Sequence, residues 1–235
     1  MNRRTLIVGG GALVVGGRAT PAAAARKGEE SGEHEEEVAP GEDLMREHGV
    51  LRRVMLVYDE ATRRLETGEP PPAAPIAAGA KLVRRVIEDY HEKLEEDFLF
   101  PRFEKAGRLQ DLVATLRAQH QAGRGVTEAI LKLGGGPLRA DADRKGLAAL
   151  LRAFNRMYRP HAAREDTVLF PAFHELVGRN AYRELGESFE DREKKVLGKE
   201  GFEGAVREVA KLESEVGIAD LAQFTPKPPA TMGRK

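Results

Sequence analysis

The sequence predicts an all-α protein: an antiparallel, up-down four-helix bundle built from two αα-hairpin repeats, followed by a charged helical extension. Two observations lead to this prediction. The pattern H-x-x-x-E-[ED]-x-x-L-F-P occurs twice, starting at His91 and at His161. Between residues 43 and 168, apolar side chains recur at helical spacing in four stretches that proline or glycine residues separate. Four such helices joined by short connections are expected to pack as an antiparallel bundle.

The first repeat contains two predicted helices. An apolar stripe over residues 43–64 predicts the first helix, and His48 interrupts this stripe where another apolar side chain would be expected. Four prolines between residues 70 and 75 break the helix and form a stiff connection. The second helix carries the first motif on its inner face. Pro101 disfavours a helical conformation for the preceding residue, so this helix is predicted to end near Leu99.

The second repeat has the same organisation. A third helix is predicted from about Leu109 to the glycine run at residues 134–136, and His120 occupies a core position on it, as His48 does on the first helix. A fourth helix is predicted from about Asp143, carries the second motif, and is expected to stop at Pro171.

Composition excludes several classes of protein. A chain of 235 residues, 41% of them hydrophobic, can bury one sizeable core, or one domain plus a small extension. The 38 basic and 38 acidic residues balance without a concentrated basic patch, so we expect no nucleic-acid partner. The absence of cysteine excludes disulfides, iron–sulfur clusters, thiolate zinc sites and a cysteine nucleophile. Any metal must therefore be bound through nitrogen and oxygen.

Residues 1–25 have the pattern of an export signal. A twin arginine at Arg3 and Arg4 precedes the apolar run Leu6–Val15, and small residues follow as far as Ala25. The run is shorter than the about 20 apolar residues that a membrane span needs, so we expect cleavage and no stable span afterwards. The arginine pair is typical of the twin-arginine route, which exports folded proteins, and predicts a periplasmic location. The alternative is an uncleaved N-terminal anchor.

Two regions flank the predicted bundle, which we place at residues 41–178. Residues 26–40 are rich in glycine and glutamate and predict a flexible acidic linker. His34 lies in this linker and lacks the preorganisation that a metal ligand needs. Residues 179–235 predict a charged helical extension and tail, with thin apolar seams along residues 180–197 and 202–216.

The repeated motif predicts a metal site. A histidine and a glutamate four residues apart lie on the same face of a helix, with Cβ atoms about 5–6 Å apart, and can bind one ion together. Two such helices facing each other would present carboxylates able to bridge two ions. The alternative is that both pairs lie on solvated faces. Burying these polar groups would be costly unless they are paired or coordinated. The core-facing candidate ligands are His48, His91, Glu95, His120, His161 and Glu165.

This ordered set, H…HxxxE…H…HxxxE with both Leu-Phe-Pro segments, resembles the hemerythrin family in its broad bacterial form. The resemblance covers residues 42 to about 177. It implies that the four histidines are terminal ligands and that Glu95 and Glu165 bridge two iron ions. Imidazole and carboxylate ligands alone would also suit zinc or manganese.

One position departs from the oxygen-carrying members of that family. They have a second histidine four residues after the one on the third helix, where this chain has Arg124. A guanidinium cannot ligate a metal and would repel it, unless it points away or pairs with a carboxylate. Glu92 or water is then expected to complete the coordination, which argues against reversible oxygen carriage and leaves more open coordination for small oxidants.

Three functions are consistent with the sequence. The first is a non-haem di-iron protein that binds dioxygen, peroxide or a related small oxidant for sensing, buffering or scavenging. The second is a di-iron peroxidase or oxidase, with Tyr58, Tyr90 or Tyr158 as electron or proton donors. The third is a non-redox metal-binding module or scaffold. The first is favoured over a dedicated enzyme, although peroxidase-like activity stays open, and no protein partner is predicted.

Overall fold

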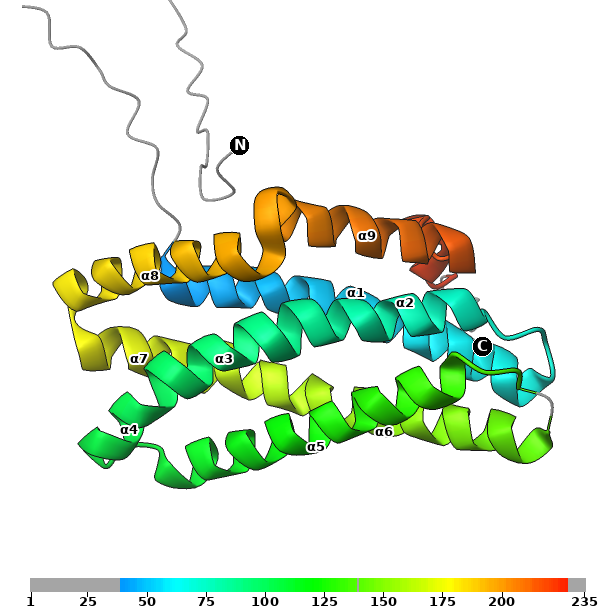
Figure 1. Ribbon diagram of the computed structural model, residues 1–235, viewed down its shortest axis with the longest axis horizontal. Coiled ribbons are helices and arrows are strands. Elements are labelled where there is room, and N and C mark those ends of the chain that lie inside the picture. Colours follow the sequence, from blue (N-terminus) through cyan, green and yellow to red (C-terminus); the bar gives the residue numbers. More distant parts are fainter. Residues whose placement is uncertain (1–38, 139, 228–235) are drawn as a thin grey trace, which may run out of the picture. The chain divides into compact units, whose positions relative to one another are not determined.

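The computed structural model describes residues 39–138 and 140–227 (Figure 1). All regular structure in these residues is helical, and they contain no strand. The prediction of an all-α fold is therefore confirmed. The predicted export signal and nearly all of the predicted acidic linker lie outside the described residues. None of the described helices is both long and apolar enough to cross a membrane.

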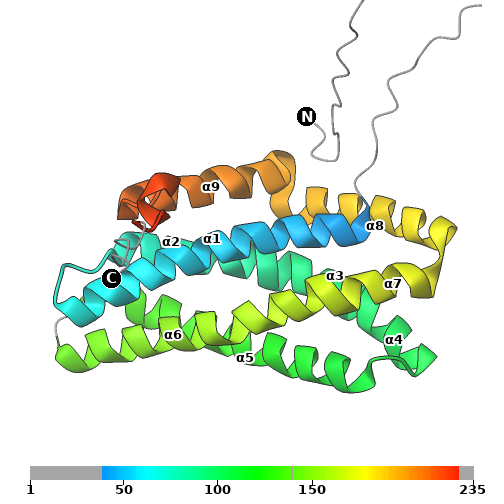
Figure 2. The same cartoon turned by 180° about the vertical axis from the view of Figure 1, so that it is seen from behind.

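Four long helical segments pack against one another. Helix α1 packs against α6 and α2, and helix α5 packs against α6 and α2 (Figures 1 and 2). The second and fourth segments each contain several consecutive helices without an intervening loop. The segments are α1 (Pro40–Thr67); α2 (Ala73–Val83) through α3 (Glu92–Leu94) to α4 (Phe100–Ala106); α5 (Gln110–Gly134); and α6 (Asp141–Arg164) with α7 (Phe170–Val177).

The predictions that Pro101 and Pro171 end their helices are wrong. Both helices continue past the proline, as α4 and α7. A π-helical turn precedes each of them, η2 (Glu95–Leu99) or η3 (Glu165–Leu169), in which the closing N–H donates to a carbonyl five residues back. Each proline thus falls in the first turn of the following α-helix, where its missing N–H breaks no helical hydrogen bond. A third π-helical segment, η1 (Arg84–His91), precedes α3.

The C-terminal extension forms two helices where the apolar seams predict them, α8 (Arg179–Leu197) and α9 (Gly201–Val216). A 3₁₀ turn, η4 (Gly198–Glu200), separates them, and a second one, η5 (Leu221–Phe224), follows. Gly198 and Gly201 have φ values of 71° and 52° in conformations that only glycine adopts readily. Helix α9 packs on α1 and α2, as Figure 2 shows for α1. Helix α8 packs on η1. The extension therefore forms an additional layer against the bundle.

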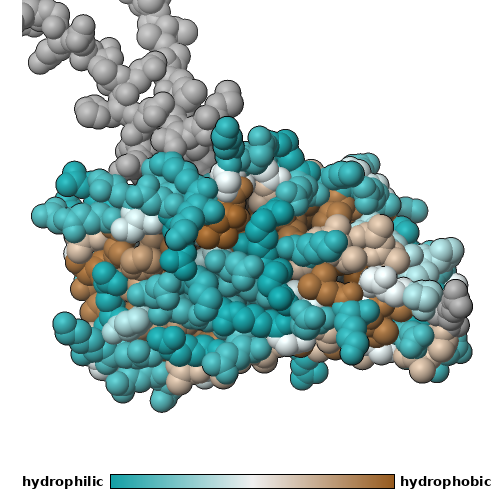
Figure 3. All heavy atoms as spheres, in the orientation of Figure 1, coloured by the Kyte–Doolittle hydropathy of each residue, from teal (hydrophilic) through white to brown (hydrophobic). Residues whose placement is uncertain are grey.

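The buried apolar side chains form two clusters that the helices pass through in turn. The larger cluster includes Leu51, Tyr58, Ile87, Ile130, Phe154 and Val209. The aromatic cluster includes Tyr90, Phe100, Val113, Phe170, Phe173 and Phe189. Along α1, α5 and the α6–α7 segment, the histidines lie between residues of one cluster and residues of the other. The candidate site is thus a polar layer between two apolar cores. On the face seen in Figure 3, hydrophilic side chains predominate and apolar ones form separate patches.

Phe189→Ala tests whether α8 belongs to the core. The Phe189 ring is fully buried and lies 5.6 Å from the ring of Phe98. We expect this change to lower the free energy of unfolding by about 3–5 kcal/mol, because it leaves a cavity in a packed core. Phe224→Ala is the control, since Phe224 is 50% exposed. Denaturant unfolding followed by circular dichroism measures both; equal, small effects would show that the extension adds nothing to the core.

Candidate metal centre

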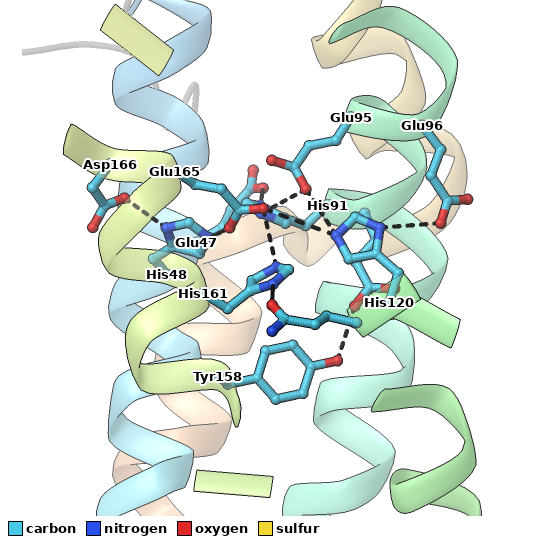
Figure 4. A network of polar contacts seen from close by, with 12 residues as sticks. Glu47, His48, His91, Glu95, Glu96, His120, Tyr158, His161, Glu165 and Asp166 are labelled. Atoms are coloured by element: carbon cyan, nitrogen blue, oxygen red, sulfur yellow. Dashed lines mark hydrogen bonds and ion pairs between the residues drawn. The ribbon is translucent and has the colours of Figure 1, made fainter. Parts of the chain in front are cut away.

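All six predicted ligand residues come together in the polar layer (Figure 4). They come from α1, the α2–α4 segment, α5 and the α6–α7 segment, so each of the four long segments contributes. Each of the six is at most 4% exposed. Their role as ligands stays a prediction, but the geometry places them where a metal centre would require them.

Glu165 lies between imidazoles from both repeats. Its Oε2 is 3.3 Å from Nε2 of His48, and its Oε1 is 3.0 Å from Nε2 of His161. The same Oε1 lies 3.9 Å from Nε2 of His120. One carboxylate thus faces three of the four histidines, as a bridging group would.

Glu95 lies between the imidazoles of His91 and His120. Its Oε2 is 3.3 Å from Nε2 of His120 and 3.7 Å from Nε2 of His91. These two histidines belong to different repeats. Both carboxylates therefore lie between histidines of the two repeats. All four imidazoles turn Nε2 toward these carboxylates.

The outward nitrogen of each histidine has its own acceptor. For His48 and His120, the acceptor is the acidic residue that follows the motif glutamate: Nδ1 of His48 is 2.6 Å from Oδ1 of Asp166, and Nδ1 of His120 is 3.1 Å from Oε1 of Glu96. With Nδ1–H donating outward, the neutral imidazole keeps Nε2 free for a metal. The sequence reasoning missed this role, although the [ED] position of the motif signals it.

The motif histidines use acceptors on the neighbouring first or third helix. Nδ1 of His91 is 2.8 Å from Oε2 of Glu47, and Nδ1 of His161 is 2.8 Å from Oε1 of Gln119. Glu47 and Gln119 each immediately precede a histidine of the site. Sequence analysis missed both, because a single acidic or amide residue beside a histidine carries no distinctive pattern.

The phenylalanines of the Leu-Phe-Pro segments also belong to the site. The ring of Phe170 stacks on His48, with centroids 5.6 Å apart and planes inclined by 23°. The ring of Phe100 stacks on His120, with the corresponding values of 5.4 Å and 28°. Each motif therefore supplies a carboxylate and an aromatic ring to the first histidine of the other repeat.

The guanidinium of Arg124 pairs with carboxylates. Such pairing would allow its positive charge to lie near a bound metal ion. Its Nη2 is 2.8 Å from Oε2 of Glu92 and 2.8 Å from Oε1 of Glu96. Arg52 forms the corresponding ion pair with Asp166 in the other half. Arginines four residues after His120 and His48 thus hold the acidic residues that orient those histidines.

Glu92 is buried beside the site. It accepts a hydrogen bond of 2.9 Å from the hydroxyl of Tyr158, in addition to its ion pair with Arg124. Burial raises the pKa of Glu92 above its usual range, against the opposing effects of His120 and Arg124. Glu92, Glu96 and His120 could each offer an atom to one ion, with the three atoms within 4.8 Å of one another.

Of the three tyrosines considered as donors, Tyr158 is the one linked to the site. Its ring centroid lies 5.5 Å from that of His161. A Cβ at Gly123 would collide with the Tyr158 hydroxyl oxygen, so glycine makes room for it there. Tyr58 packs in the larger apolar cluster, and the hydroxyl of Tyr90 donates to the carbonyl of Phe189.

The remaining histidine of the described residues, His174, lies apart from the site. His174 is exposed, and its ring centroid lies 4.7 Å from that of Tyr182. His34 lies outside the described residues.

The buried polar atoms of the layer fit a metal cation. Within the described residues, Nε2 of His91 and of His120 and both carboxylate oxygens of Glu95 and Glu165 are buried without a hydrogen-bond partner. Unpaired buried groups of this kind are costly unless a cation compensates them. Besides the group of Glu92, Glu96 and His120, two further groups of residues could each hold an ion, with ligand atoms within 4.8 Å of one another. These groups are His48, His91 and Glu165, and His120, His161 and Glu165.

Electrostatics within the site favours positive charge. Burial lowers the pKa of His48, but Asp166 and Glu165 outweigh burial and raise that pKa to about 9. Burial likewise lowers the pKa of His120, while Glu95 and Glu96 raise it to about 10. Burial raises the pKa of Glu165, yet the neighbouring histidines hold it well below its usual range. Protons on the imidazoles stabilise the metal-free layer, and a bound cation would displace them.

The fold and site define a helical protein with a buried histidine–carboxylate site for a metal cation. Comparison with known proteins agrees: the hemerythrin HHE cation-binding domain matches residues 39–173. The chain belongs to this family, whose domain binds metal cations, typically iron.

Relatives of the chain occur in mycobacteria. Uncharacterised proteins of Mycobacterium bovis and of two strains of Mycobacterium tuberculosis are each 45% identical to it over 195 residues. The matched region covers 83% of this chain and 76% of each relative. No solved structure matches the chain.

His161→Ala tests the ligand set. We expect it to weaken metal binding at least about tenfold, because it removes an inward Nε2 and leaves Glu165 without one of its partners. His174→Ala is the matched control and should bind metal as the native chain does. Equilibrium dialysis with metal analysis measures both. Equal losses in the two variants would show that the ligand set is wrong.

The stability of the metal-free protein should depend on pH. Because the pKa values of His48 and His120 are raised above 6.5, their contribution is complete below pH 6.5 and is lost as the pH rises through about 9 to 10. We therefore expect the melting temperature of metal-free protein to fall by several degrees between pH 7 and pH 10. Metal-free His48→Gln should show a smaller fall in thermal unfolding over the same range. Identical profiles for both proteins would contradict these raised pKa values.

Proposed function

We propose that this protein holds two iron ions in the polar layer and reacts with dioxygen, peroxide or a related small oxidant, for sensing, buffering or scavenging. The observation that supports two ions is the position of the two carboxylates. Glu165 belongs to two of the three groups of potential ligands, and Glu95 lies between His91 and His120. A carboxylate placed between two sets of imidazoles can bridge two cations. Zinc and manganese suit the same ligands and are the alternatives.

Bound iron would supply the redox chemistry toward the oxidant, and the residues of the chain prepare the site for it. Acceptors on the four Nδ1 atoms orient the imidazoles. Phe100 and Phe170 cover two of the rings and exclude water from them. The Tyr158 hydroxyl donates its proton in a hydrogen bond to Glu92, and the Tyr158 ring lies beside His161.

Arg124 supports reaction with an oxidant over reversible oxygen carriage. Oxygen carriers have a second histidine on the third helix at this position. Arg124 instead forms ion pairs with Glu92 and Glu96. Glu92 is engaged by both Arg124 and Tyr158, so water is the simpler completion of the coordination. A small oxidant could displace a water molecule from that coordination position.

A di-iron peroxidase or oxidase is the second candidate. The observation that favours it is the hydrogen bond between Tyr158 and Glu92, because a buried tyrosine beside the ligands can serve as an electron or proton donor. Catalytic turnover of peroxide by the iron-loaded protein, lost in Tyr158→Phe, would favour this candidate over the first.

Two further proposals concern topology and location. The core is proposed to be an up-down four-helix bundle, with α8 and α9 as an added layer, on the basis of the four long segments. Residues 1–25 are proposed to be a twin-arginine signal that directs the protein to the periplasm, on the basis of Arg3, Arg4 and the apolar run after them. An uncleaved anchor is the alternative. Mass spectrometry of the protein from its host would find a mature N-terminus near residue 26, and an intact Met1 would contradict the proposal.

Metal analysis and mixing experiments test the central proposal. Protein isolated from its host should contain about two iron ions per chain, and the reduced protein should change its absorbance on mixing with oxygen or peroxide. One ion per chain, or stoichiometric zinc, would contradict the di-iron assignment. Failure to react with either oxidant would leave a non-redox metal-binding module as the function.

Arg124→His tests the role of the missing histidine. The variant places an imidazole four residues after His120, on the same helical face, and so fills a coordination position. We expect the reduced native chain to be oxidised within seconds of mixing with oxygen, and the variant to release oxygen reversibly and to turn over peroxide at least about tenfold more slowly. Stopped-flow absorbance measures both. Arg124→Gln is the control that removes the cation without adding a ligand, and an equal effect in this control would show that the imidazole is not the cause.

A further inference from the structure

The two halves of the site differ in the acceptor that supports one histidine, and we infer that this difference makes the two metal positions unequal. The half with His48 and His91 binds its cation first and more tightly than the half with His120 and His161. Gln119 is the residue that weakens the second half. This inference rests on the proposed two-metal function and adds an order of filling to it.

The supports of the first histidine in each half are closely matched. His48 has a carboxylate from Asp166 on Nδ1, a stacked phenylalanine, and an arginine that holds the carboxylate. His120 has the same three kinds of support, with Glu96 as the carboxylate and Arg124 as the arginine. The kinds of support are therefore the same in both halves, although the Nδ1 distance is 2.6 Å for His48 and 3.1 Å for His120.

The supports of the second histidine are not matched. Nδ1 of His91 lies 2.8 Å from a carboxylate oxygen of Glu47, and Nδ1 of His161 lies 2.8 Å from the amide oxygen of Gln119. The distances are equal, and the two acceptors occupy the same place in their repeats, one residue before His48 and before His120. The difference lies in the chemistry of the acceptor, an acid in one half and a neutral amide in the other.

That chemistry changes the inward nitrogen. A hydrogen bond to an ionised acceptor is roughly twice as strong as one to a neutral acceptor. The carboxylate draws the Nδ1 proton outward more strongly, which makes Nε2 more electron-rich and a better donor to a metal cation. Changes in such supporting groups typically alter metal affinity by about 10–100-fold. The same range is expected between the two positions here.

Glu92 does not reverse this order. It is an additional carboxylate close to His120. The equivalent position of the second motif is Ala162, so that motif supplies no corresponding acid. However, Glu92 already accepts from the Tyr158 hydroxyl and pairs with Arg124. Its charge is thus largely compensated, whereas Gln119 brings no charge to His161 at all.

The test is a competition titration of metal-free protein with Zn²⁺, which is redox-silent, against a chromophoric chelator, repeated anaerobically with Fe²⁺. The native chain should bind two ions in two steps with dissociation constants about 10–100-fold apart. Gln119→Glu should strengthen the weaker step and leave the tighter one unchanged, so that the steps merge. Glu47→Gln should weaken the tighter step and leave the weaker one unchanged.

Matched controls make the same chemical changes on the same helices at exposed positions. Gln121→Glu lies on α5 and Glu42→Gln lies on α1, and both should bind as the native chain does. Gln119→Glu and Glu47→Gln are each nearly isosteric with the native residue. Either variant by itself tests the order of filling.

The outcomes separate this inference from the proposed function. Two equal steps in the native chain, unchanged by Gln119→Glu, would overturn the order of filling and leave the two-metal proposal standing. Strengthening of the tighter step by Gln119→Glu would also overturn it, because Gln119 would then support the stronger position. A single ion, or none, would contradict the two-metal proposal itself and remove the inference with it.

Discussion

The burial of four imidazoles and two carboxylates in one layer is the constraint on which the rest of the structure depends. These groups lie between two apolar clusters, where an uncompensated charge costs several kcal/mol. The outward acceptors, the arginines behind them and the stacked phenylalanines all lessen that cost. The inward Nε2 atoms and carboxylate oxygens remain available to a metal cation. A bound cation would therefore both stabilise the fold and complete the site.

The exchange of supports between repeats follows from this constraint. Asp166 of the second motif holds His48, and Glu96 of the first motif holds His120. Neither αα-hairpin can therefore assemble its half of the site alone. The two hairpins must pack before His48 and His120 are oriented, whereas His91 and His161 have acceptors within their own repeats. The packing of the two repeats is thus linked to the formation of the site.

The π-helical turns help to arrange the side chains of the polar layer. Both π-helical turns, η2 and η3, begin at the motif glutamate and end before the Phe-Pro pair. Consecutive acidic residues then contact different parts of the layer: Glu95 faces inward, while Glu96 reaches the outer side of His120. The continued helix also places Phe100 on His120. π-helical turns of this kind are frequent at functional sites.

The sequence by itself determined the helical class, the six candidate ligands and the helices of the extension, because helical periodicity and an i, i+4 pair are local properties of the chain. It could not determine the partners Glu47, Gln119 and Asp166, since their contacts join residues that are far apart in sequence and whose neighbours only packing decides. The prediction that Pro101 and Pro171 end their helices was wrong, because a π-helical turn, for which the sequence carries no local signal, places each proline in the first turn of the next α-helix. The tertiary structure alone decided that Arg124 pairs with Glu92 and Glu96, since a guanidinium near a metal is tolerated only where carboxylates from other turns reach it.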